Sequence, residues 1–550
     1  MSRKSKGKEQ GAGNKSGALS RRSLLRCVAA LGLSEVWPIG SDAMATDSST
    51  TSKASASRIE QAYQIRVQAA ELQRKKGAIL HATNSDEQRY TDHIASYSKG
   101  LPHNKKGEVE PGAFEIFVGA LQSGDPYQLE RIPLGGYTKL ANPQGAWAFD
   151  LVGPDCSQLE LASAPAFASA EQAGEMCELY WRALAADVPF AEYETNDIIS
   201  KACEDLSRLS DFRGPKSEGS NTAETIFRGP FAGCLPGPHV SQFLLRDIPL
   251  SPVRAAQKIR TALPGISYAS RYEDWLNLQN GALAGVNEFD PQPRYIRSGR
   301  DLGEYVHRDF TYQAFVCAAL MLFNMGASPD GGNPYKYSRT QSGFVTFGSP
   351  YVFQLIAIVT SVALKAVWFH KWLMHRRLRP EEFAGRVHNQ LTKQSEYQIH
   401  SDLLNSAVVK LVLEKTGSYL LPLAYPEGCP LHPSYPAGHA AIAGACATAL
   451  KACFDESYVV PNPVVSSSDG LSLVPHGGMS LTVGGELHKL AANIALGRDF
   501  AEVHWRSDSI EGIKLGEEAA IRVLQEMKLT GNELFSGFSL TKFDGSKVTI

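Results

Sequence analysis

Three short segments of the sequence carry side chains that could together bind a tetrahedral oxyanion. The first runs from Lys371 to Arg379 and is followed by Pro380. An ammonium group and a forked guanidinium on one segment can bind different oxygens of a single anion. Pro380 has no amide proton and disfavours helix at the preceding residue, so we expect a helix to end near it. The alternative is that these cations only stabilise a helix C-terminus or face solvent.

The second segment runs from His432 to His439 and contains two prolines and Gly438. Small, helix-forming residues follow at 440–445, so we expect Gly438 and His439 at the N-terminus of a helix. Free amide groups and the positive end of the helix dipole suit an anion there, and Gly438 has no Cβ to keep the anion away. His439 could exchange a proton at this position. The alternative is a glycine turn with a capping histidine.

The third segment contains Arg498, His504 and Asp508. Six positions along a continuous helix turn through about 240°, so Arg498 and His504 converge on one ligand only if the helix is broken between them. The sequence from Asp508 to Glu511 resembles a capping box, which predicts that a new helix begins there. Asp508 then either orients the imidazole of His504 or only caps this helix.

Helices must position these segments, and the apolar periodicity predicts a mainly α-helical protein built as a large helical bundle. We expect residues 301–540 to form the helical core that carries the site, with residues 59–300 wrapped around it. Core helices are predicted at 304–325, 350–378, 397–415, 438–454, 486–497 and 508–527. Earlier helices are predicted at 59–76, 169–182 and 195–209, with a short one within 252–262. Many glycines and prolines at 100–165 predict loops with short strands at most.

The composition argues against several classes of partner. The chain has 550 residues, 43% of them hydrophobic, and a formal net charge of -2, which favours neither nucleic acid nor an anionic membrane surface. The most apolar run, 351–364, is interrupted by Lys365 and is too short to span a bilayer. We therefore expect a buried core helix there and no membrane span.

The N-terminus has the pattern of an export signal. Arg21 and Arg22 precede an apolar stretch, as in a twin-arginine signal, and residues 43–45 offer a small-residue cleavage site. We therefore expect a signal peptide at 1–45, a disordered linker at 46–58, and export to the periplasm or out of the cell. The alternative is a disordered basic tail.

The nine cysteines include no CxxC pair, which argues against a zinc or iron–sulfur site. Cys27 would leave with the signal. The other eight could form disulfides or remain buried free thiols.

Taken in order, the three segments resemble the signature of the superfamily that joins type-2 phosphatidic acid phosphatases and vanadium haloperoxidases. Vanadate and phosphate share charge and tetrahedral shape, so one site can serve either. The seven residues between Lys371 and Arg379, and a histidine at position 432, resemble the algal and bacterial bromoperoxidases. Trp368 and Asp309 also fall where family members keep a tryptophan and an acidic residue near the site. The likeness is strong over about 295–520.

The resemblance implies a vanadate cofactor bound through one nitrogen of His504. The groups around its oxygens would be Lys371, Arg379, Gly438 and Arg498. His439 would act as acid and base, with Asp309 close by, and His432 would favour bromide over chloride. The implied reaction oxidises bromide or iodide with hydrogen peroxide to a hypohalous-acid equivalent, which halogenates small organic acceptors. Algal relatives assemble into oligomers, so a homo-oligomer is expected.

One residue departs from the family pattern: Ala437 precedes Gly438 where the family usually has serine. The missing hydroxyl would have donated a hydrogen bond to the anion, so we expect weaker vanadate binding or an altered halide preference. Two alternatives to a haloperoxidase remain open. One is an acid phosphatase that forms a phosphohistidine at His504. The other is a non-catalytic secreted protein that keeps the helical scaffold.

Overall fold

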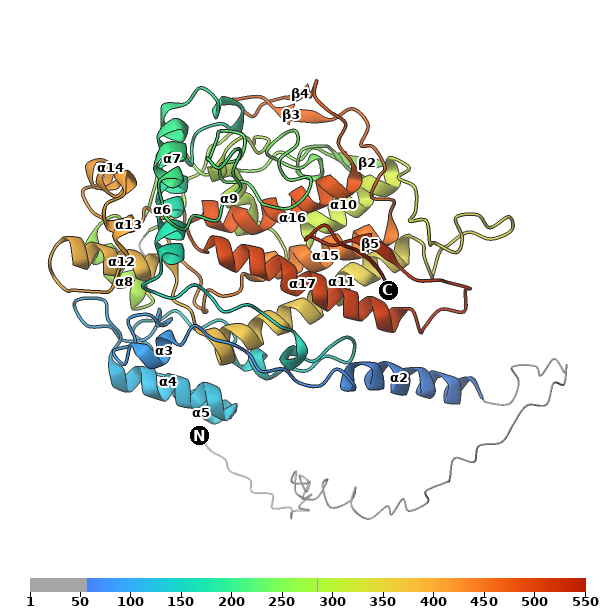
Figure 1. Ribbon diagram of the computed structural model, residues 1–550, viewed down its shortest axis with the longest axis horizontal. Coiled ribbons are helices and arrows are strands. Elements are labelled where there is room, and N and C mark those ends of the chain that lie inside the picture. The colour runs from blue at the N-terminus through green and yellow to red at the C-terminus, as the bar shows by residue number, and fades with distance from the viewer. Residues whose placement is uncertain (1–56, 284) are drawn as a thin grey trace, which may run out of the picture. The chain divides into compact units, whose positions relative to one another are not determined.

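The computed structural model describes residues 57–283 and 285–550, and these are mostly helical (Figure 1). The mainly α-helical fold class is confirmed. Of the two compact units, Met1–Gln61 and Ala62–Ile550, the second holds nearly all of the described elements. The predicted signal peptide at 1–45 and most of the predicted linker at 46–58 lie outside the described residues.

Four long helices form the centre of the second unit (Figure 1). They are α11 (Ser349–Phe369), α15 (Gly438–Cys453), α16 (Val483–Phe500) and α17 (Arg506–Met527). α15 packs against the other three, and every residue from Ala440 to Ala452 is buried. Most of these residues are alanine or glycine, whose small side chains let neighbouring helices approach from every side.

The backbones of α15 and α17 touch at two glycines. A Cβ built on Gly444 would overlap the carbonyl oxygen of Ile513, and a Cβ built on Gly516 would overlap that of Ala441. Any larger residue would therefore force the two helices apart. The contact holds the N-terminus of α15 beside the first turn of α17, where the Ala437 amide donates to the Asp508 carbonyl oxygen at 3.0 Å.

α11 ends in an irregular turn that the periodicity did not predict. It continues into a π-helical turn, η5 (His370–His375), and Arg376 then leaves the helix with a left-handed backbone (φ 35°). Pro380 is the first residue of the next helix, α12 (Pro380–Leu391). The predicted helix at 350–378 is thus wrong at its C-terminal end, because the fixed φ of proline suits the first turn of a helix as well as it stops one.

Two other predicted helices are each divided. The stretch 304–325 comprises α9 (Gly299–Arg308), which packs against α16, and α10 (Gln313–Asn324). The break places Asp309 directly after α9, with an extended backbone. The stretch 397–415 comprises α13 (Ser401–Leu404) and α14 (Ala407–Thr416), because the Ser406 side chain accepts from the Val408 amide and begins a new helix.

The first half of the chain contains more helix than its glycines and prolines predicted. Its helices are α2 (Arg58–Arg74), α3 (Asp86–Arg89), α4 (Pro111–Ser123), α5 (Pro126–Leu129), α6 (Ala170–Ala185), α7 (Asp197–Ser207) and α8 (Tyr272–Gln279). α4 lies where only loops and strands were expected. Its Pro-Gly start resembles a loop, but three side chains on one face, Phe114, Phe117 and Leu121, are buried and hold it as a helix.

The strands are short and form three separate antiparallel pairs. They are β1 (Ile248–Leu250) with β2 (Val253–Ala255), β3 (Val464–Ser466) with β4 (Leu473–Pro475), and β5 (Ser539–Thr541) with β6 (Lys547–Thr549). In the first pair Pro249 lies opposite Arg254. This hairpin overlaps the short helix expected within 252–262, which is therefore wrong.

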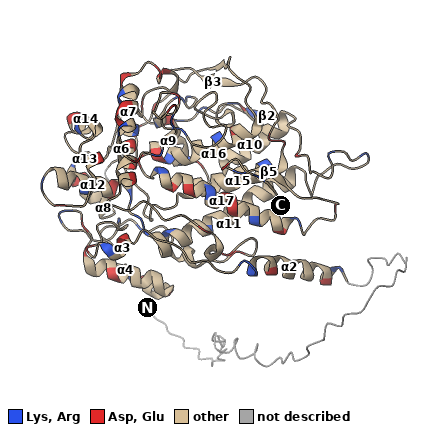
Figure 2. Ribbon diagram, viewed as in Figure 1, with Lys and Arg blue, Asp and Glu red and all other residues tan. Residues whose placement is uncertain are grey.

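Charged residues of both signs are interspersed along the helices of the second unit (Figure 2). One stretch, Ser349–His375, is long and apolar enough to cross a membrane by length and composition. Half of its most apolar window is buried inside the protein, which is typical of the core helix expected here. The eight cysteines in the described residues are all free thiols, so the disulfide alternative is wrong for them in this structure.

Candidate oxyanion-binding site

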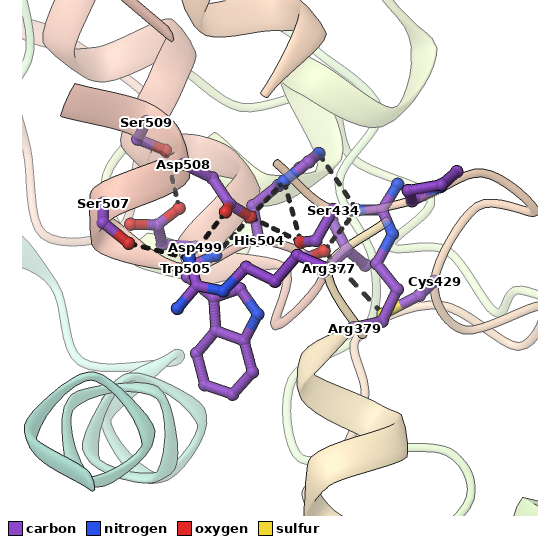
Figure 3. A network of polar contacts seen from close by, with 12 residues as sticks. Arg377, Arg379, Cys429, Ser434, Asp499, His504, Trp505, Ser507, Asp508 and Ser509 are labelled. Carbon is purple, nitrogen blue, oxygen red and sulfur yellow. Dashed lines mark hydrogen bonds and ion pairs between the residues drawn. The ribbon is translucent and has the colours of Figure 1, made fainter. Parts of the chain in front are cut away.

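The break predicted between Arg498 and His504 is present. α16 ends at Phe500, Glu502 has a left-handed backbone (φ 57°), and α17 begins at Arg506. His504 therefore lies in a short link between two helices, and only 2% of it is exposed. The link brings its imidazole toward the segments that carry Arg379 and Ser434 (Figure 3).

Asp508 both orients His504 and caps α17. Its Oδ2 accepts from Nδ1 of His504 at 2.8 Å and from the amide of Trp505 at 3.1 Å. The capping box predicted to begin at Asp508 is displaced, since Trp505 is the N-cap and Asp508 is the third helical residue. Because the carboxylate can only accept, Nδ1 carries the proton and Nε2 of His504 keeps its lone pair.

Three cations come together around this histidine, and we call Lys371, Arg379 and Arg498 the cradle cations. Lys371 lies on the π-helical turn, Arg379 at the N-cap of α12 and Arg498 in the last turn of α16. Lys371 and Arg379 are fully buried and Arg498 is 6% exposed. Nη1 of Arg379 lies 3.0 Å from Nε2 of His504, so the lone pair of that nitrogen points into the group of cations.

Within residues 57–283 and 285–550, none of the cradle cations forms an ion pair with a carboxylate. Nζ of Lys371 donates to the carbonyl oxygens of Pro433 and Ser434, both at 2.6 Å. Nη1 of Arg379 donates to the Val503 carbonyl oxygen at 2.6 Å, and Nη1 of Arg498 donates to that of Val306 at 2.8 Å. Nε of Arg498 is buried without a hydrogen-bond partner.

This concentration of positive charge changes the protonation of its members. Burial, and then Arg379, hold the pKa of Lys371 well below its ordinary value. Burial, followed by Arg379 and Lys371, likewise holds the pKa of His504 well below the usual imidazole value, so the ring is neutral. A neutral imidazole is the form that can donate a lone pair to a metal centre. Bound negative charge would offset the repulsion that these cations exert on one another.

The N-terminus of α15 supplies uncapped amides to the same place. Its N-cap is Ala437, which has no side-chain acceptor for the first amides. A Cβ built on Gly438 would meet only side-chain atoms of Leu364 and Trp368, both at an ordinary 3.8 Å. The protein itself therefore does not require glycine at position 438, and a ligand that approaches the amide closely would.

His439 and Asp309 form the more open side of the site. Nε2 of His439 lies 3.1 Å from Oδ1 of Asp309, and the His439 side chain is 28% exposed while that of Asp309 is only 4% exposed. The break between α9 and α10 is what places Asp309 here. A solvent-reached imidazole with a fixed carboxylate partner can take up and release a proton.

His432 and Trp368 also lie where the sequence predicted. Nη2 of Arg379 lies 2.9 Å from Nδ1 of His432, and the His432 ring centroid is 5.1 Å from that of Trp368. Burial, and then Lys371 and Arg379, hold the pKa of His432 well below its ordinary value. His432 is thus a neutral side chain next to a cradle cation.

Together these groups fit a tetrahedral oxyanion with a metal centre. Buried cations without a carboxylate partner are costly, and an anion with several oxygens would remove that cost while it bonds to Nε2 of His504 in place of Arg379. A bare divalent cation does not fit, because the described residues contain no cluster of three His, Cys, Asp or Glu side chains able to hold one. Every predicted site residue is found at this one place.

Three residues at the site were not predicted: Glu175, Arg377 and Ser434. Oγ of Ser434 donates to Asp508, which also pairs with Arg377 (Figure 3). Arg377 in turn joins Asp508 to Glu175. Arg377 stands in a run with two other arginines, and nothing in the run marks which one faces the site. Glu175 is 202 residues from Arg377, so no local pattern connects them.

Comparisons with known proteins agree with this geometry. Residues 352–532 match a family model described as the VCPO second helical-bundle domain. A vanadium-dependent bromoperoxidase from Ascophyllum nodosum is 34% identical over 530 residues, which cover 90% of this chain and 94% of that protein. Another from Corallina pilulifera is 33% identical, with 90% and 98% covered. The homohexameric structure of the second vanadate-dependent bromoperoxidase from A. nodosum matches with a TM-score of 0.85 at 28% identity and covers 95% of both chains.

Proposed function

This chain belongs to the vanadium-dependent bromoperoxidases, and we propose that its buried cationic site binds vanadate and uses hydrogen peroxide to oxidise bromide. The observation that carries the proposal is the set of cradle cations, which face no carboxylate among the described residues, around the unprotonated Nε2 of His504. Bromide, hydrogen peroxide and a proton give hypobromous acid and water. The hypobromous acid equivalent then halogenates small organic acceptors.

Different groups of the site would bind different parts of the cofactor. His504 would bind it through Nε2, and Asp508 keeps that nitrogen unprotonated by accepting from Nδ1. The oxygens would be held by Lys371, Arg379, Arg498 and the amide of Gly438. When bound, vanadate supplies a Lewis-acidic centre that activates hydrogen peroxide toward attack by the halide. The cations keep excess negative charge from weakening that centre.

His439 would transfer protons during the reaction. The reaction consumes one proton, and hydrogen peroxide must lose protons as it binds. His439 is a partly exposed imidazole of the site, and its Nε2 lies 3.1 Å from Oδ1 of Asp309. Asp309 therefore acts through His439 and positions it. His432, held neutral beside Arg379, would influence which halide is preferred.

Bromination of phenol red tests this function. Protein dialysed free of vanadate and phosphate is assayed with bromide and hydrogen peroxide, before and after orthovanadate is added. We expect activity only with vanadate, suppressed by competing phosphate and absent in His504→Ala. No bromination, together with hydrolysis of p-nitrophenyl phosphate, would instead support the acid phosphatase alternative. The absence of both activities would support the alternative of a non-catalytic protein that keeps the helical scaffold.

Two further properties belong to the same proposal. Export through the twin-arginine route is supported by Arg21 and Arg22 ahead of an apolar stretch. Replacing both arginines with lysine should keep the protein in the cytoplasm, as cell fractionation would show. Self-association is supported by the homohexameric relative. Light scattering coupled to gel filtration of the full chain should give a mass at least twice the 59.7 kDa of one chain.

A further inference from the structure

Arg377 is a buried arginine beside the site that does not point at the cradle. Its side chain is 2% exposed, and its Nη1 donates to Oδ1 of Asp508 at 2.8 Å. Its Nη2 donates to Oε2 of Glu175 at 2.8 Å and to Oε1 of Gln172 at 2.7 Å. Its guanidinium carbon also lies 5.0 Å from the centroid of the Trp505 ring. Arg377 thus joins α6, in the first half of the chain, to the first turn of α17.

Glu175, on α6, contacts both Arg377 and the first turn of α17. Its carboxylate accepts from Arg377 and from both the amide and Oγ of Ser507. All of these groups are donors, which matches an ionised carboxylate. Burial raises the pKa of Glu175, and Arg377 opposes that rise. Asp508 and Glu175 in turn raise the pKa of Arg377, although burial lowers it.

The formal charges of Arg377, Asp508 and Glu175 determine the net charge beside Nδ1 of His504. Arg377 with Asp508 alone would be a neutral pair, one positive and one negative charge. Glu175 adds a second negative charge, so the three side chains together carry one net negative charge. That charge lies on the side of His504 opposite the cradle cations, where it favours hydrogen-bond donation by Nδ1.

We propose that Glu175 and Arg377 are positioning residues that hold the Asp508 carboxylate in place against Nδ1 of His504, so that Nε2 of His504 stays a strong ligand for vanadate. The proposal rests on the proposed function, because it concerns the affinity of that same site. It predicts that helix α6, which contributes no group to the cradle, controls how tightly the cofactor binds. Ligand histidines in metalloproteins lose about 10–100-fold in metal affinity when the groups behind them are removed.

The test compares two buried glutamates one turn apart on α6. Glu178 is also ion-paired, to Arg182 and Arg506, but it does not contact Asp508. Glu175→Gln and Glu178→Gln are prepared free of vanadate, and orthovanadate binding is measured by isothermal titration calorimetry. Thermal unfolding of each variant is measured alongside. A purely structural role would lower the stability of both variants and leave the vanadate affinity of both unchanged.

We expect Glu175→Gln to weaken vanadate binding by about tenfold or more, and Glu178→Gln to change it by less than about twofold. Equal affinity in Glu175→Gln and wild type, or equal losses in both variants, would overturn the proposal. If wild-type protein binds neither vanadate nor inorganic phosphate, the proposed function fails and the positioning role fails with it. Tight wild-type binding with unaffected Glu175→Gln removes only the positioning role.

A second pair covers the case in which Glu175→Gln does not fold. Arg376 is the neighbour of Arg377 and is paired with Glu87, but it lies away from Asp508. Arg377→Lys keeps the charge and loses the fork that bridges two carboxylates. We expect Arg377→Lys to weaken vanadate binding severalfold and Arg376→Lys to leave it unchanged. Unchanged binding in both would contradict the proposal.

Discussion

Two groups of buried cations lie side by side in this protein, and they differ in what faces them. The cradle cations contact carbonyl oxygens and histidines but no carboxylate within the described residues. The second group, which we call the paired arginines, consists of Arg182, Arg377 and Arg506. Each of these is bound to Glu175, Glu178 or Asp508.

These two groups differ in their charge balance more than in residue type or burial. Arg377 and Arg379 are two residues apart and both are buried. One is neutralised by the protein and the other is left for an anion from outside. Keeping an unpaired charge in the interior destabilises the empty protein, and such a cost is retained where a ligand offsets it.

The largest effect should come from removing the nitrogen that the cradle cations surround. His504→Ala should lower bromination by about 10³-fold or more, because it removes the nitrogen through which we propose that the cofactor binds. Inorganic phosphate should still bind to this variant through the cations, as calorimetry would detect. The control is His488→Ala, which removes a buried histidine outside the site that contacts Lys451 and the Ala232 carbonyl oxygen. A fully active His504→Ala enzyme would refute the assigned site.

The sharpest comparison of the two groups uses methionine substitutions measured by denaturant unfolding without vanadate. Arg377→Met leaves two buried carboxylates unpaired and should lower the free energy of unfolding by about 3–5 kcal/mol. Arg379→Met removes a cation that has no carboxylate partner, so it should lower the free energy of unfolding much less than Arg377→Met. The same change two residues away would thus have a much smaller effect. Equal destabilisation by both would mean that the cradle cations are balanced by a group of the protein itself.

Cofactor addition should stabilise the protein through the cradle alone. At a vanadate concentration of 100 times its dissociation constant, linkage adds about 2.7 kcal/mol to the free energy of unfolding. Wild-type protein should therefore melt at a higher temperature with orthovanadate or, more weakly, with phosphate. Arg379→Met should show little of this increase, whereas Arg376→Met should keep it. An equal increase in Arg379→Met would place the anion elsewhere.

The smallest predicted effect restores a hydroxyl at the edge of the cradle. Ala437→Ser should tighten vanadate binding by up to about tenfold, since a hydrogen bond to a charged group contributes about 1.5–3 kcal/mol before desolvation and rotamer costs. Serine at this N-cap would also stabilise α15 by about 1 kcal/mol. The affinity must therefore be measured by titration and not by melting temperature alone. Unchanged vanadate affinity would show that Ala437 is not the cause of any weaker binding.

The cradle cations and His504 were predictable from the sequence. The groups that hold Asp508, which are Glu175, Arg377 and Ser434, were not. On a continuous helix Arg498 and His504 would point in different directions, so the prediction that they converge required a break between them. The structure has this break. Each segment carries its ligand groups within a few residues, so local spacing was sufficient. Glu175 reaches the site only through tertiary packing of α6, which no spacing in the sequence records.

Helix ends were the weakest part of the sequence-based prediction of the fold. Proline signals both the end of one helix and the start of the next, and at Pro380 the second meaning applies. The π-helical turn at 370–375 was not predictable from a 3.6-residue period, although it is what directs Lys371 inward. In α4, burial of three apolar side chains overrides a loop-like start.

The glycine contacts between α15 and α17 have a consequence for anion selection. Gly438 begins α15 and His504 lies two residues before α17, and main-chain atoms of these two helices meet directly at Gly444 and Gly516. No side chain at these contacts can change rotamer to widen or narrow the spacing. The aperture of the site is therefore fixed by peptide geometry, so oxyanions of equal charge should be ranked by the length of their bonds to oxygen.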